Sequence, residues 1–525
     1  MARTLERPPW RGSAGLALLW MSLVLSACTT LGPDYQEPGV EWLSGWQTDL
    51  YGQIGDRQHQ SDVDLRFWWQ LFDDPVLNGL IDTARRQNPS LRIAGLRILE
   101  SRAVLGIAGS NLYPQVQQVS SAVAFANTRQ RGGALPNSQD SFTSYQADFN
   151  VGWELDFWGR FQRGIESADA AFFASITNQQ DAQVLLSAQV TDLYFAYRTT
   201  LQRITIAREN AAVQKRSFEI TERLYKSGQS SELDLQQAKT QYLATLSTVP
   251  ALEVTLTQIR NALGALLARS PGDLPELTGV GGPLPVIEPV VVQEVPARLL
   301  MRRPDIRAAA WQAAAQSAQI GIAEADFYPA ISLFGSVGWS GNTVSGSPNT
   351  GSIAVGPAVT WNVFDYGRIS NNVRVQDARL QQSIEAFQNS VLQAAREIDD
   401  AAISVVKTRE QQVFLDEALI AAQRSLELAN TRYAEGYADF QRVLDAQRAQ
   451  FSQAERALVN RGNQIGAVIS FYKAIGGGWL EMPIEQMVPE TERDTMQSRS
   501  DWGDLMTAPL PTNVDNPSSA SESAP

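Results

Sequence analysis

The residue types that most often do chemistry in proteins are scarce in this chain. Histidine occurs once among the 525 residues, as His59 in the polar stretch GDRQHQSD. A zinc site with several histidines is therefore excluded, and a catalytic triad would have to use His59, which its polar surroundings place on an exposed loop. The glycine clusters at 279–282 and 476–479 lack phosphate-loop spacing and are interpreted as a linker turn and a helix stop. We predict no catalytic residue, no metal site and no cofactor, and hence no enzyme.

Cysteine also occurs once, and its position predicts a lipid modification. Arg3, Arg7 and Arg11 precede an apolar run over 15–25, and the sequence LSAC then ends at Cys28. A basic start, a short apolar segment and small residues before the cut are typical of a secretory signal, and the cysteine directly after them resembles a bacterial lipobox. We predict that residues 1–27 are removed and that Cys28 carries diacylglycerol and an N-acyl chain. The alternative is an ordinary signal with a chance cysteine.

Charge and apolar content limit the possible partners. The formal net charge is −13, and because residues 1–27 carry a net charge of +2, the mature chain is close to −15. Such acidity argues against nucleic acid as a partner, since phosphates are bound by Lys and Arg. No mature segment has about 18 uninterrupted apolar residues, so no membrane-spanning helix is predicted.

The mature chain contains one unit twice. The stretch LYKSGQSSELDLQQAKTQ matches RYAEGYADFQRVLDAQRA, so that Tyr225 and Gly228 correspond to Tyr433 and Gly436 at an offset of 208 residues. Farther towards the N-terminus the offset is 215, which places an insertion in a loop of the first unit. We divide the mature chain into an N-terminal segment (28–79), a first repeat (80–269), a linker rich in Pro and Gly (270–296), a second repeat (297–480) and an acidic tail predicted to be disordered (481–525).

Each repeat is predicted to hold one very long helix and two shorter ones. The long helices cover about 158–226 and 366–433, and the shorter ones cover 80–112 and 231–268 in the first unit and 297–327 and 439–475 in the second. Positions spaced by four and three residues from Leu186 to Phe218, and from Ala394 to Leu426, are mostly apolar, which indicates a coiled-coil seam. The Tyr-x-x-Gly turns are the far tips of two helical hairpins.

Four strands are predicted beside the loops, at about 115–127, 144–156, 330–340 and 352–364. Apolar and polar residues alternate in them, and Trp153, Trp339 and Trp361 lie near their ends. Strands of about ten residues with aromatic ends are typical of an outer-membrane barrel, and the alternative is a soluble antiparallel sheet packed on helices. Four strands cannot close a barrel, and an open edge in lipid is prohibitively costly, so the sheet must join sheets of other subunits.

These features together resemble the outer-membrane factors of tripartite export pumps, of the TolC and OprM type. The resemblance covers about 28 to 480 and is carried by RFWWQLFDDPVLNGLI (66–81), LLMRRPDIRAA (299–309), DFYPAIS (326–332), RYAEGYADFQRVLDAQRAQ (432–450) and YKAIGGGW (472–479). The lipobox, RRPDI and YKAIGGGW are similar to the lipoprotein OprM-like (NodT) branch.

The resemblance implies an α+β membrane protein that is a passive exit duct. In the family, four strands from each of three subunits form a twelve-stranded barrel in the outer membrane, above a coiled-coil tunnel through the periplasm. The implied partners are two further copies of the chain, a periplasmic adaptor, an inner-membrane RND transporter that supplies the energy, and outer-membrane lipid. Two rivals remain, namely the outlet of a type I protein secretion system and a periplasmic structural lipoprotein without a pore.

The resemblance also implies a gate at the periplasmic end. Matched to the family pattern, the gate residues are Tyr433, Asp445 and Arg448, and the tip turns at Tyr225, Gly228, Tyr433 and Gly436 contact the adaptor. The first repeat has Gln237 where the second has Asp445. An apolar gate residue of OprM-like proteins falls on Gln441, which puts a hydrophobic constriction there in doubt. The alternative for Asp445 is a solvated carboxylate paired with Arg448 one turn on.

Overall fold

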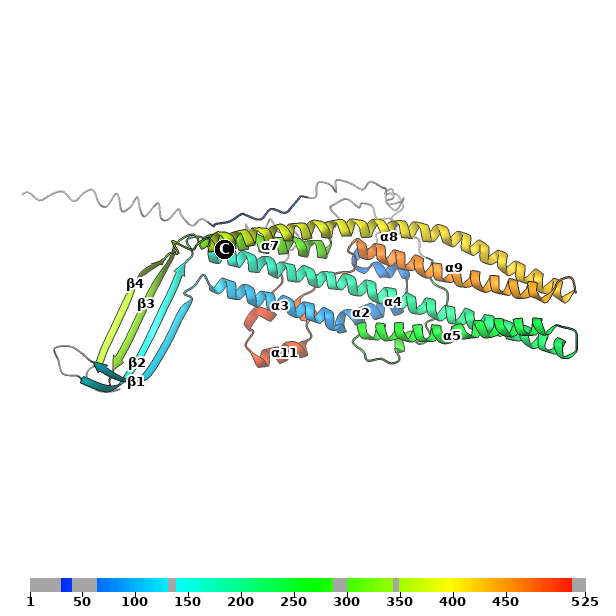
Figure 1. The fold of residues 1–525 in the computed structure, drawn as a ribbon, viewed down its shortest axis with the longest axis horizontal. Coiled ribbons are helices and arrows are strands. Elements are labelled where there is room, and N and C mark those ends of the chain that lie inside the picture. Colours follow the sequence, from blue (N-terminus) through cyan, green and yellow to red (C-terminus); the bar gives the residue numbers. More distant parts are fainter. Residues whose placement is uncertain (1–29, 40–63, 131–137, 287–299, 343–348, 512–525) are drawn as a thin grey trace, which may run out of the picture.

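The protein is an elongated helical body with a sheet at one end (Figure 1). The structure, a computed structural model, describes residues 30–39, 64–130, 138–286, 300–342 and 349–511. Cys28, His59, the last ten residues of the linker and the last fourteen residues of the chain lie outside the described residues. Among the described residues, no helix combines the length and the apolar content needed to cross a bilayer.

Two helices run the whole length of the body, and the shorter ones lie end to end beside them (Figure 1). α4 packs against α3, α5, α7 and α9, whereas α8 packs against α7 and α9. At about 1.5 Å per residue, each 67-residue helix is about 100 Å long. The bounds, close to those predicted for the long and return helices, are α3 (Pro89–Ser110), α4 (Arg160–Lys226), α5 (Glu232–Leu266), α7 (Pro304–Ala325), α8 (Arg368–Ala434) and α9 (Phe440–Ala474).

The predicted coiled-coil seam is buried along both long helices. Val190, Ile204 and Ala211 on α4, and Ile398, Val405 and Leu415 on α8, are among its buried members. The seam residues that are not fully buried are still partly covered by neighbouring helices. The heptad pattern therefore correctly identified the packing face of each long helix.

The first predicted helix, 80–112, is wrong in one respect, because two helices share this stretch. α2 (Pro75–Gln87) ends at Asn88 and α3 begins at Pro89. A residue before proline avoids the α conformation, and Asn88 is extended, with its side-chain oxygen accepting the amide of Leu91 at 3.1 Å. Its side-chain amide also donates to the carbonyl of Leu266 at 3.0 Å, which joins this break to the end of α5.

The four strands form one antiparallel sheet in the order β1-β2-β3-β4. They are β1 (Val116–Gln130), β2 (Ser138–Leu155), β3 (Ala330–Gly341) and β4 (Asn349–Thr360). Trp153 lies opposite Leu333 at the end nearest the helices, and Trp339 lies opposite Ala147 near the other end. Within one chain, the outer edges of β1 and β4 have no neighbouring strand among the described residues.

The predicted fourth strand, 352–364, is displaced towards the N-terminus by a few residues. β4 ends at Thr360, so Trp361 and Val363 lie beyond the sheet. The indole of Trp361 donates to the carbonyl of Phe327 at 2.9 Å, and the indole of Trp153 donates to the carbonyl of Leu112 at 3.0 Å. Both tryptophans thus bond to the chain where the sheet meets the helices, but Trp153 is still paired within β2, whereas Trp361 lies just beyond the end of β4.

A second correction concerns the tail. Residues 481–511 are not disordered, because they form α10 (Ile484–Met487), α11 (Glu490–Arg499) and a final turn (Gly503–Met506) along α3. Ile484, Met487 and Met506 are buried in a cluster with side chains of α3 and α4, and Arg102 donates to the carbonyls of Leu505 at 2.6 Å and Pro509 at 3.2 Å. Composition averaged over the tail conceals these few apolar anchors.

Candidate functional site

The two hairpin tips, residues 226–231 and 434–439, have the same backbone design. Gly228 and Gly436 have φ values of 73° and 81°, a left-handed conformation that glycine adopts without a Cβ penalty. The Gly228 amide donates to the carbonyl of Tyr225 at 2.9 Å, and the Gly436 amide donates to that of Tyr433 at 3.0 Å. The Tyr-x-x-Gly repeat therefore encodes two matching helix ends.

The two tip tyrosines have different surroundings. Tyr225 is exposed, whereas Tyr433 is half-buried beside a cluster that contains Ala238 of α5 and Val443 of α9. The rings of Tyr433 and Phe440 have their centroids 5.4 Å apart. Burial raises the pKa of Tyr433, and the negative charge of Asp234 adds to the effect. Tyr433 thus packs between the hairpins as a neutral phenol.

Asp445 and Arg448 lie together near this cluster, on the first turns of α9. Arg448 Nη1 and Asp445 Oδ1 are 3.5 Å apart, with side chains 51% and 58% exposed. Gln441 Nε2 donates to the same carboxylate oxygen at 3.2 Å. An exposed pair at this distance contributes little to stability. The predicted intrachain pair is therefore present, but it is weak.

Another contact of Arg448, which crosses to the first hairpin, was not predicted from the sequence. The guanidinium Nε donates to the side-chain oxygen of Gln241 on α5, which joins the second hairpin to the first. One residue earlier, Gln447 is buried and donates to the hydroxyl of Ser217 on α4 at 3.0 Å. Both bonds join a return helix of one repeat to the other repeat.

The repeat comparison contains a signal that could have located these contacts. Gln237, Lys239 and Thr240 of the first repeat stand where the second has Asp445, Gln447 and Arg448. The flanking alanines, Ala238 and Ala446, are the same in both. Two of these three positions, Gln447 and Arg448, bond the second hairpin to the first, whereas Asp445 contacts side chains of its own helix.

The RRPDI motif forms a second polar centre, midway along the body. Arg303 is buried and donates to the carbonyl of Ala474 at 2.6 Å, and it pairs with Asp305 at 2.8 Å and Glu397 at 3.0 Å. The motif therefore joins the start of α7 to α8 and to the end of α9. Burial raises the pKa of the nearby Asp181 carboxyl to about 6, with help from the charges of Asp305 and Glu397, although Arg303 and Lys473 oppose the shift.

We expect Asp181→Asn to stabilise the protein at neutral pH. Because the folded-state pKa is raised, the folded chain binds more protons than the unfolded chain between about pH 4 and 6, and stability falls as pH rises through that window. Removing the charge should regain about 1–3 kcal/mol per subunit above pH 6. Thermal unfolding of wild type and variant from pH 4 to 8 measures this, with exposed Glu209→Gln as control. Equal stabilisation at every pH would contradict it.

No group of three or more potential metal ligands exists among the residues that the structure describes. What remains is a long helical body with two matched hairpins at one end and a small sheet with two open edges at the other. The family model described as outer membrane efflux protein matches residues 80–269 and 295–477, which lie close to the bounds predicted for the two repeats.

The chain belongs to the outer membrane efflux protein family.

Individual relatives agree with this assignment. The toluene efflux pump outer membrane protein TtgF of Pseudomonas putida is 30% identical over 469 residues, covering 87% of this chain and 96% of its own length. The outer membrane protein OprJ of Pseudomonas aeruginosa is 30% identical over 486 residues, covering 89% of this chain and 96% of its own. The probable outer membrane lipoprotein SilC of Salmonella typhimurium is 29% identical over 469 residues, with 87% and 97% covered.

Solved structures share the fold. The outer-membrane channel OprN superposes with a TM-score of 0.77 at 30% identity, covering 86% of this chain and 99% of that structure. The predicted resemblance to outer-membrane efflux proteins is thus confirmed, while the assignment to the lipoprotein branch stays a prediction. The protein is an outer-membrane exit duct of an efflux system and not an enzyme.

Proposed function

We propose that three copies of this chain close into a passive duct that takes small molecules from an inner-membrane RND transporter and a periplasmic adaptor to the exterior. The proposal rests on the two sides of each subunit, where an outer strand and an outer helix lack a neighbour among the described residues. β1 and β4 are the outer strands of the sheet, and α5 and α8 are the outer helices of the body. The first repeat supplies β1 and α5, and the second supplies β4 and α8.

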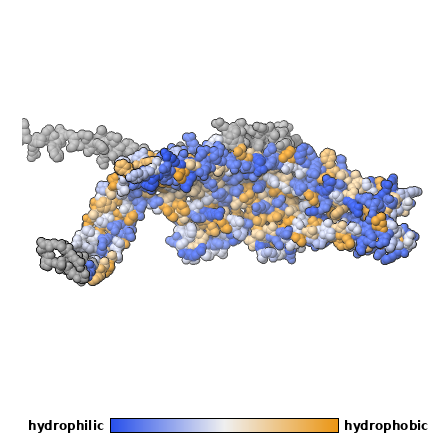
Figure 2. All heavy atoms as spheres, in the orientation of Figure 1, coloured by the Kyte–Doolittle hydropathy of each residue, from blue (hydrophilic) through white to orange (hydrophobic). Residues whose placement is uncertain are grey.

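The outer helices carry apolar side chains on the faces that point away from the subunit. On α5 these are Leu243, Leu246 and Val254, and on α8 they are Val413, Phe414, Ile420 and Leu428. Each set follows helical spacing, so each forms a stripe that would be buried against another helix. Figure 2 shows apolar side chains over the sheet too, with mostly hydrophilic ones around the hairpin tips.

A contact between the second-repeat side of one copy and the first-repeat side of the next gives both the outer strands and the outer helices a neighbour. It pairs β4 with β1 and buries α8 against α5, and such a head-to-tail contact gives a closed ring when the rotation fits. Three copies would give a barrel of twelve strands with no open edge in lipid. The count of three is what membership of the family implies.

The tips at Tyr225, Gly228, Tyr433 and Gly436 are then the periplasmic end of the duct, where we propose that the adaptor binds. Gate control is assigned to Tyr433, Asp445 and Arg448, since the last of these joins the two hairpins. The matched relatives are named for toluene efflux and, in Escherichia coli, for cation efflux. We infer that the inner-membrane transporter rather than the duct selects the cargo.

Conduction by purified protein in a planar bilayer tests this function. We expect discrete single-channel currents that are small when the tips are closed, and native masses in detergent at multiples of three. A folded protein that never conducts, even after the gate variants described below, would favour a structural lipoprotein. A type I secretion outlet would instead be favoured if the protein co-purified with an ABC transporter and its adaptor.

The lipid anchor is a separate prediction. We expect the mature chain to start at Cys28 with diacylglycerol and one N-acyl chain, because LSAC has the lipobox pattern and Cys28 is the only cysteine. Thr29 follows rather than aspartate, which in lipoprotein sorting lets the protein leave the inner membrane for the outer one. Intact-mass measurement decides this, and Cys28→Ala is the control. A mature chain of another length, or one without acyl mass, would contradict it.

A further inference from the structure

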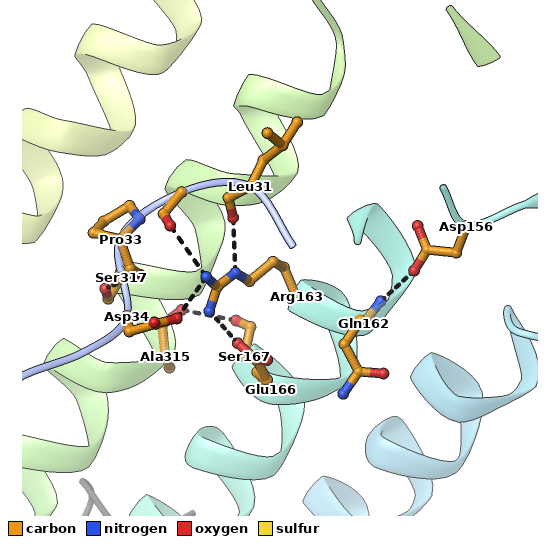
Figure 3. Close-up of polar contacts among 11 residues, drawn as sticks. Leu31, Pro33, Asp34, Asp156, Gln162, Arg163, Glu166, Ser167, Ala315 and Ser317 are labelled. Atoms are coloured by element: carbon orange, nitrogen blue, oxygen red, sulfur yellow. Dashed lines mark hydrogen bonds and ion pairs between the residues drawn. The ribbon is translucent and has the colours of Figure 1, made fainter. Parts of the chain in front are cut away.

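The described chain begins with an arm, residues 30–39, whose first residues are bound between α4 and α7 (Figure 3). The amide of Leu31 donates to the carbonyl of Trp158 at 3.3 Å. The side chain of Arg163, only 5% exposed, donates to the carbonyls of Leu31 at 2.8 Å and Gly32 at 3.1 Å, and it pairs with Asp34 at 2.8 Å. Because charge-assisted hydrogen bonds are stronger than neutral ones, these bonds from the buried guanidinium bind the arm firmly to α4.

The groove that receives the arm depends on two glycines. A Cβ atom added to Gly321 of α7 would overlap the carbonyl oxygen of Leu31 and lie 2.8 Å from Cγ of Arg163. A Cβ atom added to Gly159, just before α4, would lie 2.7 Å from Cα of Thr30. Only the absence of side chains at these two places lets the arm approach so closely.

The same groove lies at the base of the sheet. Trp158, which accepts the Leu31 amide, is three residues beyond the end of β2, and its indole donates to the carbonyl of Pro329, the residue before β3, at 2.9 Å. Its ring stacks on Tyr328 with centroids 4.6 Å apart. The arm is therefore held where β2 and β3 join the helices.

We propose that the groove formed by Gly159, Arg163 and Gly321 is a docking site that fixes the lipid anchor of each subunit beside the base of β2 and β3. The proposal rests on the acylation of Cys28 proposed above. Two residues of chain span at most about 7 Å, so a docked Thr30 holds Cys28 within that distance of the groove. The acyl chains then enter the bilayer next to the same strands in every subunit.

Release of the arm would give the anchor far more freedom. The next described segment begins only at Asp64, 36 residues after Cys28, so the docked arm is the described point of attachment nearest to the anchor. The docking site therefore positions the anchor, because it leaves only Thr29 between Cys28 and the docked Thr30. Arg163, Gly159 and Gly321 are positioning residues for the anchor, and none of them is needed for acylation itself.

The test compares Gly321→Ala with Gly164→Ala in full-length protein purified from membranes. Both changes replace a helical glycine by the better helix former, but a Cβ at Gly164 meets no atom within 4 Å. We expect Gly321→Ala to raise the hydrogen-exchange rate of the Leu31 amide at least tenfold, with acyl mass unchanged, and Gly164→Ala to leave the rate as in wild type. Asp34→Asn, at an exposed position, should act in the same direction as Gly321→Ala and covers the case in which Gly321→Ala fails to fold.

Position is measured by growing cells on a photoactivatable fatty acid and mapping cross-links from the lipopeptide that begins at Cys28. In wild type and Gly164→Ala, most cross-links should fall near 153–159 and 328–334, and in Gly321→Ala that share should drop severalfold. A cross-link pattern that is the same in all variants would overturn the proposal, as would fast exchange at Leu31 in wild type. Absence of acyl mass in wild type would instead refute the acylation, independently of the exchange result.

Discussion

Arg448→Ala should raise single-channel conductance, and by more than Asp445→Ala. The Arg448 guanidinium bonds to Gln241 of the other hairpin, whereas the exposed Asp445 carboxylate contacts side chains of its own helix, Gln441 at 3.2 Å and Arg448 at 3.5 Å. Loss of arginine therefore removes this joint between the hairpins in all three subunits of the proposed ring, while the Gln447–Ser217 bond remains. Loss of aspartate leaves that joint in place. Conductance and open fraction in planar bilayers, at several salt concentrations, measure the difference.

The size of the effect follows from the bond that is lost. A hydrogen bond to a charged group contributes about 1.5–3 kcal/mol, and each 1.4 kcal/mol is about tenfold in an equilibrium constant. We therefore expect the ratio of open to closed time to rise at least tenfold for Arg448→Ala. Asp445→Ala should change this ratio less but weaken cation preference, because three carboxylates would otherwise face one axis.

Two matched variants test the reason for the effect as well as the effect itself. Gln241→Ala should reproduce Arg448→Ala, and the double variant should add little, because both changes remove the same bond. Arg442→Ala removes a more exposed arginine of the same helix, which pairs with Asp439 one turn away at 3.7 Å, and it should conduct like wild type. If Arg448→Ala conducts like Arg442→Ala, the hairpins are not joined there and the gate lies elsewhere.

Much of this architecture follows from the sequence because its signals are long and repeated. The heptads of α4 and α8 persist over many helical turns. The Tyr-x-x-Gly sequence ends a long helix in both repeats, so each copy supports the interpretation of the other. The strands were located by alternation, although Trp361 extended the fourth one too far. Periodicity cannot register that Trp361 leaves the ladder to bond a loop carbonyl.

The features that were missed depend on single contacts between distant segments. Arg448 and Gln241 are separated by more than 200 positions, and nothing local to either residue indicates the other. The C-terminal segment was predicted to be disordered, since its apolar anchors are few, yet Met506 and Arg102 bind it to α3. The Arg163 groove was likewise invisible, because its shape comes from glycines that are far apart in the chain.

Phe414→Glu combined with Ile420→Glu should convert trimers to monomers, which is the largest effect that we expect. Phe414 and Ile420 are 71% and 66% exposed on the outer face of α8, where the proposed ring buries them against α5 of the next copy. Burial of each such side chain contributes about 1.5–3 kcal/mol, and burial of an unpaired carboxylate costs several kcal/mol more. Six such changes act around one ring. Native mass spectrometry in detergent and size-exclusion chromatography measure the outcome.

Val213→Glu is the matched control, because Val213 is 49% exposed on α4, a helix whose two flanks are already occupied by α5 and α9 of its own subunit. The same change of an exposed apolar residue to glutamate should leave the trimer intact there. The exposed apolar side chains of α5 form the other half of the proposed contact, so Leu246→Glu with Val254→Glu should also give monomers. A mixture of the α8 double variant and the α5 double variant should not form closed rings. Trimers that survive both pairs of changes would mean that the copies meet through other faces. Loss of trimers with Val213→Glu as well would mean that the changes act on folding of the subunit. If both double variants are monomeric and Val213→Glu remains a trimer, the contact between copies lies at α8 and α5. The rotation that joins these helices would also bring together the open edges of β4 and β1, which belong to the same two repeats.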